Sequence, residues 1–190
     1  DRTHFEQKII DFFCNFIYSK ITAQINQLTP QKEGRDYMPA LQPETISLLQ
    51  YENLPEERRV EVCEGIIFDM ASPSREHQLI SMELSTTFNN YIRSKNGNCQ
   101  IFSSPFDVLL SRTPLTIVQP DLMIICNPSK LDKNRVNGAP DFIIEIVSPG
   151  NPSDDYIRKL YYYKKYGVRE YWIVDPVRKT VTVNYFDKNQ

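Results

Sequence analysis

The sequence predicts an α/β sandwich with a mixed β-sheet at its centre. In some segments apolar residues recur every three or four positions, which is typical of one face of a helix. In others they form short runs rich in Ile, Val, Phe and Tyr, which are typical of strands. Helical and strand-like segments are interspersed along the chain, and this order favours a sheet covered by helices. A chain of 190 residues suffices for one domain with a hydrophobic core.

The composition is that of an ordinary globular protein, with 41% hydrophobic and 24% charged residues. No run approaches the roughly 18 apolar residues that a membrane span requires, and no secretory leader is visible. We therefore expect a cytoplasmic protein without membrane contact, although a chain that begins at Asp1 leaves room for a preceding segment. The net charge of −2 means that any nucleic-acid binding must use a local basic patch.

The four cysteines are scattered along the chain and form no C-x-x-C pair. With only two histidines beside them, no zinc site of familiar spacing is predicted. Cysteines within apolar runs are most often small core residues, so we expect reduced thiols. The residues concerned are Cys14, Cys63, Cys99 and Cys126.

A separate helical extension is predicted at the N-terminus. Apolar residues between Phe5 and Leu28 lie on one helix face, and a segment with Pro and Gly, 29–43, reads as a linker. We therefore divide the chain into an extension and linker, 1–43, and a domain, 44–190. The apolar face of the extension has to dock on its own domain or on a second copy. We expect a homo-oligomer, for which docking on a second copy is one route.

The first half of the domain has a helix, a hairpin and a second helix. The helix is expected at 44–51, and strands 59–63 and 66–70 flank the turn at Glu64-Gly65. Ser72 followed by Pro73 predicts the start of the second helix, with the serine as its cap. This helix is expected to end at 96–98, where Asn-Gly-Asn interrupts the pattern.

The second half is mostly strands. A helix is expected at 154–166, closed by Gly167 as a left-handed cap. Two strands, 117–126 and 142–147, are almost continuously apolar, as strands buried on both faces are. The remaining strands are expected at 99–102, 106–110, 171–174 and 180–185.

Two carboxylates lie within these apolar strands. Asp121 follows Pro120, and Glu145 stands among isoleucines. A buried ionised carboxylate is costly unless it is paired or binds a cation. If the strands are neighbours, both acids and the backbone carbonyl of Ile146 could hold one Mg²⁺ ion. Alternatively, each acid faces solvent at a strand end or pairs with an arginine.

The helix that follows Glu145 carries a lysine on a defined face. Asp155, Lys159 and Tyr163 recur every four residues and so share one side of this helix. An ammonium group beside a metal site could orient a water nucleophile and neutralise the charge that develops on a phosphate. The alternative is a solvated lysine that pairs weakly with Asp155.

Several blocks of the sequence resemble the Uma family of restriction endonuclease-like proteins, within the PD-(D/E)XK nuclease superfamily. The resemblance runs from about Thr45 to the end of the chain. The blocks are Leu54-Pro-Glu-Glu-Arg-Arg-Val-Glu-Val62, Gly65 to His77, Ser104-Pro-Phe-Asp-Val108, Gln119-Pro-Asp121, Glu145-Ile-Val-Ser-Pro149, Asp155-x-x-x-Lys159-x-x-x-Tyr163 and Gly167 to Pro176.

This resemblance implies a restriction-endonuclease-like three-layer sandwich and a magnesium- or manganese-dependent endonuclease that hydrolyses DNA through a metal-activated water. Asp121 would be the metal-binding aspartate, and Glu145 the first residue of the (D/E)-x-K element. The lysine of that element would fall at Val147 and is absent. In similar members it has moved to the next helix, which points to Lys159.

Four further positions are accessory candidates. Asp107 would be a third acid near the metal or a surface carboxylate. Gln119, two residues before Asp121 on the same expected strand face, would contact a phosphate or satisfy a buried neighbour. For His77 a structural, hydrogen-bonded role is favoured over substrate contact, and for Tyr163 a role in packing.

The segment 156–179 carries seven basic and two acidic residues, which suits a phosphodiester substrate but is also typical of a solvated helix face. The competing hypothesis is a catalytically inactive nuclease-fold protein that binds nucleic acid or another protein as a homodimer. Val147 and the overall acidity favour this second hypothesis.

Overall fold

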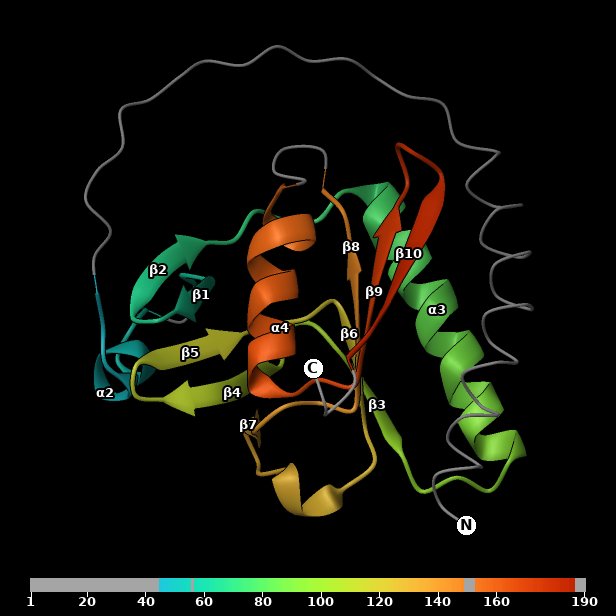
Figure 1. The fold of residues 1–190 in the computed structure, drawn as a ribbon, viewed down its shortest axis with the longest axis horizontal. Coiled ribbons are helices and arrows are strands. Elements are labelled where there is room, and N and C mark those ends of the chain that lie inside the picture. The colour runs from blue at the N-terminus through green and yellow to red at the C-terminus, as the bar shows by residue number, and fades with distance from the viewer. Residues whose placement is uncertain (1–44, 56, 149–152, 187–190) are drawn as a thin grey trace.

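The computed structural model describes residues 45–55, 57–148 and 153–186. The predicted N-terminal helix, its linker and the boundary at 43/44 lie outside the described residues. Figure 1 shows a central sheet between helix α3 on one side and helix α4 on the other, with a second sheet on the side of α4. The predicted α/β class and the layered arrangement are thereby confirmed. The strands, however, belong to two sheets and not to one.

The central sheet is mixed and has the strand order β10-β9-β8-β6-β3. Strands β8 and β9 run parallel, whereas the other neighbours are antiparallel. The parallel pair is joined by the segment that carries the 154–166 helix, as a crossover requires. The bounds are β3 Gln100–Ser103, β6 Leu122–Ile125, β8 Phe142–Ile146, β9 Glu170–Asp175 and β10 Thr180–Tyr185.

Helices cover both faces of this sheet. Successive side chains of a strand point to opposite faces, and both faces carry apolar residues that have to be buried. Helix α3, Arg75–Ser94, packs Leu84 and Phe88 against Ile144 and Trp172 on one face. On the other face Tyr163 of helix α4, Leu160–Tyr166, lies edge-on to Tyr171 at a ring-centroid distance of 4.9 Å. Full burial of such side chains stabilises the fold by about 1.5–3 kcal/mol each.

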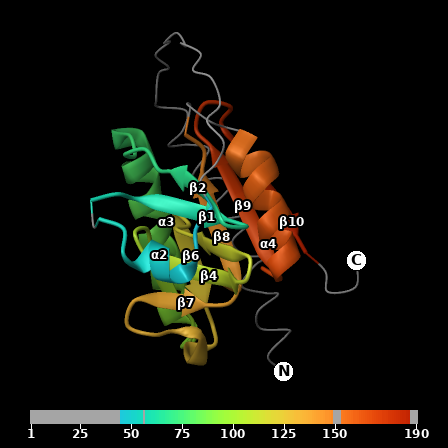
Figure 2. The same ribbon diagram turned by 90° about the vertical axis from the view of Figure 1, so that its left-hand side faces the viewer.

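The second sheet has the order β2-β1-β5-β4-β7 and is seen from its own side in Figure 2. The predicted hairpin around Glu64 and Gly65 is present, and both turn residues have positive φ, 51° and 83°. Gly65 tolerates this conformation without strain. The bounds are α2 Leu48–Glu52, β1 Val60–Cys63, β2 Ile66–Asp69, β4 Asp107–Arg112, β5 Leu115–Val118 and β7 Arg135–Asn137.

The strand expected at 117–126 is wrong as a single element. It divides into β5 in the second sheet and β6 in the central sheet, and the chain crosses between the sheets at Gln119-Pro120-Asp121. Pro120 explains the break, because proline has no N–H to give to a neighbouring strand. Gln119 and Asp121 therefore do not share one face of a continuous strand.

The long helices differ from expectation in detail. Ser74, and not Ser72, caps α3, because its side chain accepts a hydrogen bond from the His77 backbone N–H at 3.1 Å. The helix predicted at 154–166 begins as a π-helix, η2, Asp154–Lys159, and continues as α4. It ends at Gly167 with φ 86°, as predicted. A short 3₁₀ helix, η1 Pro128–Lys130, and strand β7 had no clear signal in the sequence.

The prediction that all cysteines are reduced is wrong for one pair. Cys99 and Cys126 form a disulfide. They flank β3 and β6, whose antiparallel register pairs Gln100 with Ile125 and so brings the two thiols opposite each other. Cys63 is a free, buried thiol, and Cys14 lies outside the described residues.

Among the helices of the described part of the chain, none is both long and apolar enough to cross a membrane.

Candidate active site

A groove of about 900 Å³ lies where the two sheets meet. Its walls come from β1, the loop before α3 and the first turns of that helix, the crossover at Gln119–Asp121, the end of β8, and η2. The predicted residues Asp121, Glu145, Ile146 and Lys159 all line it. Residues that are far apart in the sequence, from Arg59 to Lys159, therefore line the same groove.

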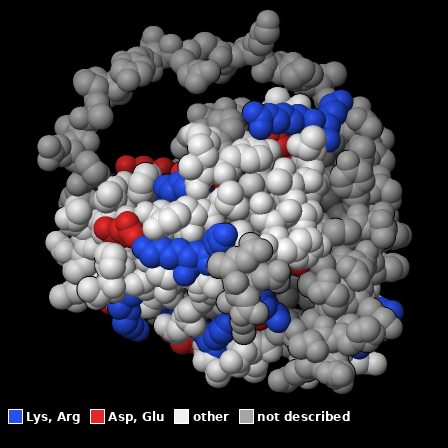
Figure 3. Space-filling model, in the orientation of Figure 1, with Lys and Arg blue, Asp and Glu red and all other residues white. Residues whose placement is uncertain are grey.

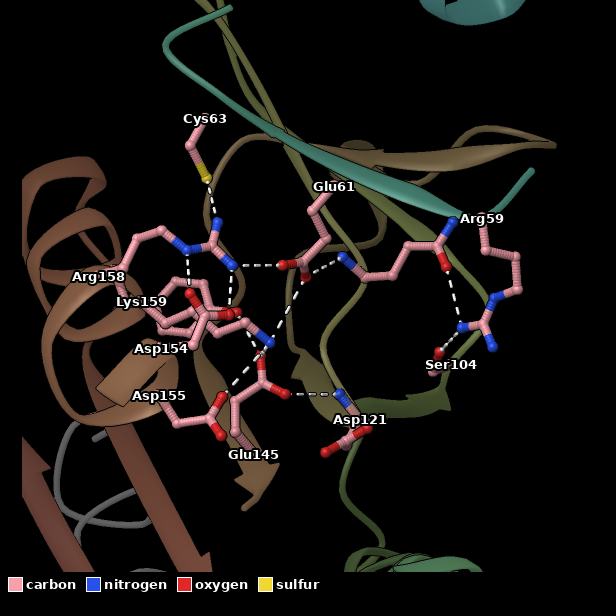
Figure 4. Close-up of polar contacts among 12 residues, drawn as sticks. Arg59, Glu61, Cys63, Ser104, Asp121, Glu145, Asp154, Asp155, Arg158 and Lys159 are labelled. Atoms are coloured by element: carbon pink, nitrogen blue, oxygen red, sulfur yellow. Dashed lines mark hydrogen bonds and ion pairs between the residues drawn. The ribbon is translucent and has the colours of Figure 1, made fainter. Parts of the chain in front are cut away.

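A hydrogen bond links the carboxylate of Glu145 to the backbone of Asp121 (Figure 4). The backbone N–H of Asp121 donates to Glu145 Oε2 at 3.3 Å, and the backbone N–H of Ile146 donates to Asp121 Oδ2 at 2.8 Å. β6 and β8 are antiparallel neighbours, with Leu122 opposite Ile144, so the two acids lie next to each other by register. The structure thus brings together the two carboxylates that the sequence singled out.

Lys159 reaches the same point from η2. Its ammonium nitrogen is 2.9 Å from Glu145 Oε1 and 3.5 Å from Asp155 Oδ1, and the side chain is 9% exposed. Tyr163, one turn further, donates its hydroxyl hydrogen to the same Glu145 oxygen at 2.5 Å. Tyr163 therefore also holds the Glu145 carboxylate, in addition to the packing role that the sequence predicted.

Val147 occupies the position at which the (D/E)-x-K element would place its lysine. It is buried on the same face of β8 as Glu145, in the core that contains Tyr163 and Tyr171. The ammonium group on this face comes from Lys159 instead.

Glu61 is a third acid of the groove that the sequence analysis did not select. It is 2% exposed on β1, and its Oε1 accepts the backbone N–H of Gln119 at 3.0 Å. The ammonium of Lys159 lies 3.5 Å from the same oxygen. The signal was present, because an acid between two valines in a strand satisfies the rule that identified Asp121 and Glu145.

Arg158 was not predicted as a site residue either. Its guanidinium donates to Glu61 Oε2 at 3.0 Å and also pairs with Asp154, while its carbon centre lies 4.1 Å from the ring centroid of Phe68. These contacts hold η2 against β1 and β2. The same guanidinium contacts the Cys63 thiol, whose pKa burial raises to about 12.

The groove carries an excess of negative charge, since six carboxylates and three cationic side chains line it. Burial raises the pKa of Glu145 well above its usual range despite the nearby Lys159, and the charge of Asp121 adds to the effect. Burial likewise raises the pKa of Asp155 to about 6. Burial alone would lower the pKa of Lys159, but Glu145, Glu61 and Asp155 together raise it well above the usual value, so this side chain stays charged.

His77 lies at the start of α3 with 9% exposure, and its Nε2 is 2.9 Å from Asp121 Oδ2. Because an ionised carboxylate only accepts hydrogen bonds, Nε2 is the donor. Nδ1 is buried and has no partner among the described residues. His77 is thus hydrogen-bonded, as favoured, and its partner is the predicted metal ligand.

Asp107 and Gln119 lie together on the side of the groove near β4. The Gln119 amide donates to Asp107 Oδ1 at 2.9 Å, and the hydroxyl of Tyr51 donates to the same carboxylate at 3.0 Å. Gln119 lines the groove, whereas Asp107 does not. The position of Asp107 therefore does not make it a third acid beside Asp121 and Glu145.

The basic residues of 156–179 do not form one patch. Lys159 is buried and Arg158 half-buried in the groove, while Lys165, Arg169 and Arg178 pair with Glu64, Asp141 and Asp175. On the face drawn in Figure 3, Lys and Arg lie in separate groups, several of them beside acidic residues.

The donor set fits a divalent cation that prefers oxygen ligands. In the described part of the chain, no cluster of three or more His, Cys, Asp or Glu side chains is arranged to hold a metal ion. Magnesium sites, however, commonly use one or two carboxylates with backbone carbonyl groups, water and substrate phosphates. Asp121 Oδ1 accepts no hydrogen bond from the described residues, and the surplus of carboxylates favours a bound cation.

A layered α/β fold in which two carboxylates and a lysine meet where β6 begins and β8 ends is nuclease-like. Comparison with known proteins makes the assignment specific. Residues 47–189 match the Uma2 family, described as "Putative restriction endonuclease". The chain belongs to this family.

Two relatives illustrate the breadth of the similarity. The chain is 30% identical over 117 residues to the uncharacterized protein slr1290 of Synechocystis sp., and the match covers 62% of this chain and 58% of that protein. The chain thus spans less than two thirds of that relative. A crystal structure described as a putative nuclease belonging to DUF820 from Anabaena variabilis superposes with a TM-score of 0.63 at 22% identity, over 76% of this chain and 82% of the other. This second likeness concerns the fold.

Proposed function

We propose that this protein is a magnesium- or manganese-dependent endonuclease that hydrolyses phosphodiester bonds of DNA. The observation that carries the proposal is the convergence of Asp121, Glu145 and Lys159. The Lys159 ammonium contacts one oxygen of Glu145, and the other oxygen accepts the backbone N–H of Asp121. Membership of the Uma2 family supports the same activity.

Asp121, Glu145 and the carbonyl of Ile146 would hold the ion. When bound, a divalent cation lowers the pKa of a coordinated water and stabilises negative charge on a phosphate. The protein supplies the orientation of the two carboxylates. His77 and the Ile146 N–H fix Asp121, while Tyr163 and Lys159 fix Glu145.

Lys159 acts as a fixed cation and hydrogen-bond donor. It is surrounded by Glu61, Glu145 and Asp155, which keep it protonated and hold its ammonium at the groove. From this position it orients the attacking water and offsets the negative charge that develops on the phosphate. Its three N–H donors cannot abstract a proton, so it is not the general base.

The alternative of an inactive nuclease-fold protein loses part of its support. It rested on Val147 and on the acidity of the chain, yet the ammonium that Val147 cannot supply comes from Lys159. The acidic groove agrees with an enzyme that needs a bound cation before it accepts a phosphodiester. A homodimer formed through the N-terminal extension remains a further proposal, because that segment lies outside the described residues.

Metal titration combined with a cleavage assay tests the proposed function. Wild-type protein should gain thermal stability with Mg²⁺ or Mn²⁺, by about 2.7 kcal/mol at 100 times the dissociation constant. Asp121→Ala should abolish this gain, whereas the exposed Asp132→Ala should keep it. If Asp121→Ala gains as much as wild type, the metal site is refuted.

The cleavage assay uses DNA and RNA oligonucleotides, single- and double-stranded, with Mn²⁺. Lys159→Ala should lose cleavage of every substrate that the wild type cuts, while Lys164→Ala, an exposed lysine of the same helix, should retain it. Equal cleavage by Lys159→Ala and wild type would refute the catalytic assignment. RNA as the preferred substrate would correct the substrate class.

A further inference from the structure

Arg59 is the one cation of the groove that has no carboxylate partner among the described residues. Its Nη2 donates to the Ser104 hydroxyl at 2.9 Å and to Gln119 Oε1 at 3.2 Å, and both partners are neutral. Its Nε is buried without a partner in that same part of the chain. The other two cations, Arg158 and Lys159, are each held by two or more carboxylates.

A chain of hydrogen bonds sets the orientation of this guanidinium. Tyr51 and the Gln119 amide both donate to Asp107, and the carbonyl oxygen of Gln119 then accepts from Arg59. The Asp107 charge reaches Arg59 only through the neutral amide, so the guanidinium is positioned without being neutralised. Gln119 thus satisfies its neighbours, which was one of the two roles considered for it, and Asp107 acts through Gln119 and not as a third acid near the metal.

The guanidinium also lies close to the predicted metal ligands along the backbone. The N–H of Ser104, whose hydroxyl contacts Arg59, donates to the carbonyl oxygen of Asp121 at 3.2 Å. Arg59, Ser104 and Asp121 all line the groove. In the view of Figure 4, Arg59 and Lys159 lie on opposite sides of Asp121.

We propose that Arg59, together with the Ser104 hydroxyl, binds a phosphate of the substrate strand adjacent to the phosphate that is cleaved. Nη2 already donates to Ser104 and Gln119 and Nε is buried, so the two Nη1 hydrogens, which have no partner among the described residues, are the donors for the phosphate. The Ser104 hydroxyl accepts from Arg59 and so keeps its own hydrogen for the same anion. The proposal rests on the proposed nuclease function and names a binding subsite within it.

The test measures DNA binding separately from DNA cleavage. Fluorescence anisotropy of a labelled oligonucleotide is recorded with Ca²⁺ in place of Mg²⁺, at several salt concentrations, and a gel verifies that the DNA is intact. Cleavage rates with Mg²⁺ give kcat and KM. The variants are Arg59→Gln, Arg59→Lys and, as matched control, the exposed Arg112→Gln, which lies outside the groove.

Arg59→Gln should raise the dissociation constant and KM about ten-fold, the value expected for losing hydrogen bonds to a charged group. It should also reduce the salt dependence of binding by about one ion, with a slope change of roughly 0.7–0.9. Arg59→Lys should keep the slope but bind more weakly than wild type, because an ammonium cannot donate to Ser104, Gln119 and a phosphate in the fixed planar geometry of the guanidinium. Arg112→Gln should match wild type.

The outcomes separate the two proposals. Cleavage with unchanged KM and unchanged salt slope in Arg59→Gln overturns the subsite and leaves the nuclease function intact. Binding that depends on Arg59 without any cleavage supports the subsite and overturns the hydrolytic function. No binding by the wild type overturns both. If Arg59→Gln does not fold, the DNA affinity of Arg59→Lys is the test. An affinity of Arg59→Lys for DNA equal to that of the wild type overturns the subsite.

Discussion

For the buried carboxylate of Asp155, pairing with Lys159 and the cost of burial have opposite effects on stability. Asp155 pairs with Lys159 at 3.5 Å, yet it is 7% exposed and faces the charges of Asp121, Asp154 and Glu61. Burial outweighs the pairing and raises its pKa to about 6 from an ordinary value of 3.8. The ionised side chain is therefore tolerated in the folded state because Lys159 is present, but it still costs free energy.

This residue predicts a defined pH dependence. Between about pH 4 and pH 6 the folded protein holds a proton on Asp155 that the unfolded chain has released, so stability falls as the pH rises. Asp155→Asn should remove this contribution, which amounts to no more than about 3 kcal/mol at 1.4 kcal/mol per pKa unit. Urea unfolding of both proteins from pH 4 to pH 8 measures it.

Asp132 provides a control of opposite sign. The backbone N–H of Asn134 lowers the pKa of this exposed carboxyl. Asp132→Asn should therefore lose stability mainly at neutral pH, where Asp155→Asn gains. If the two variants change the pH profile in the same direction, the burial argument for Asp155 is refuted.

At the scale of elements, the site residues are positioned by the first turns of two helices, η2 and α3. The π-helix η2 sets Asp155 and Lys159 against Glu145 before the chain continues as a regular α-helix, and single π turns of this kind occur often at functional sites. The first turn of α3 sets His77 against Asp121. The position of His77 depends on where α3 starts, and hence on its cap.

The cap of α3 can be tested with two neighbouring serines. Ser74→Ala should reduce the free energy of unfolding by about 1 kcal/mol, because it removes the acceptor of the His77 backbone N–H. Ser72→Ala removes the serine that the sequence pattern favoured and should have little effect. Urea denaturation of the two variants compares them directly, and an equal loss in both would contradict the assignment of the cap.

At the scale of the whole molecule, the crossover between the sheets creates the groove. The chain leaves β5, passes Pro120 and enters β6, so Gln119 faces Arg59 while Asp121 faces Glu145. The Cys99–Cys126 disulfide closes the chain around this crossover, since the two cysteines are 27 positions apart and flank β3 and β6. The disulfide thus constrains the segment that separates the two halves of the site.

Reduction of this disulfide should lower the free energy of unfolding by about 3.6 kcal/mol, from the loop entropy that the cross-link removes from the unfolded chain. Thermal unfolding with and without a phosphine reductant measures the effect. The double variant Cys99→Ser/Cys126→Ser should unfold at the lower temperature in both conditions. Alkylation of both cysteines in untreated native protein would show that the disulfide is absent.

The local pattern of the sequence predicted most of the elements. Periodicity placed α3, and Gly167 marked the end of the 154–166 helix. It could not place strand β7, which has three residues and no marked pattern of its own. The local pattern also predicted one strand where the structure has two, β5 and β6. Three residues separate these buried strands, so they look like a single apolar run, and Pro120 was the one residue that indicated a break.

In the candidate site, too, some residues could be predicted from the local sequence and others needed the tertiary structure. The cost of burying charge selected Asp121 and Glu145, and helical spacing placed Lys159 on a face with Asp155 and Tyr163; these inferences need only local sequence. The partners of Lys159 and the position of Arg59 needed the tertiary structure. Glu61 lies nearly a hundred positions from Lys159, and such contacts depend on how two sheets and a helix pack, which no local pattern encodes.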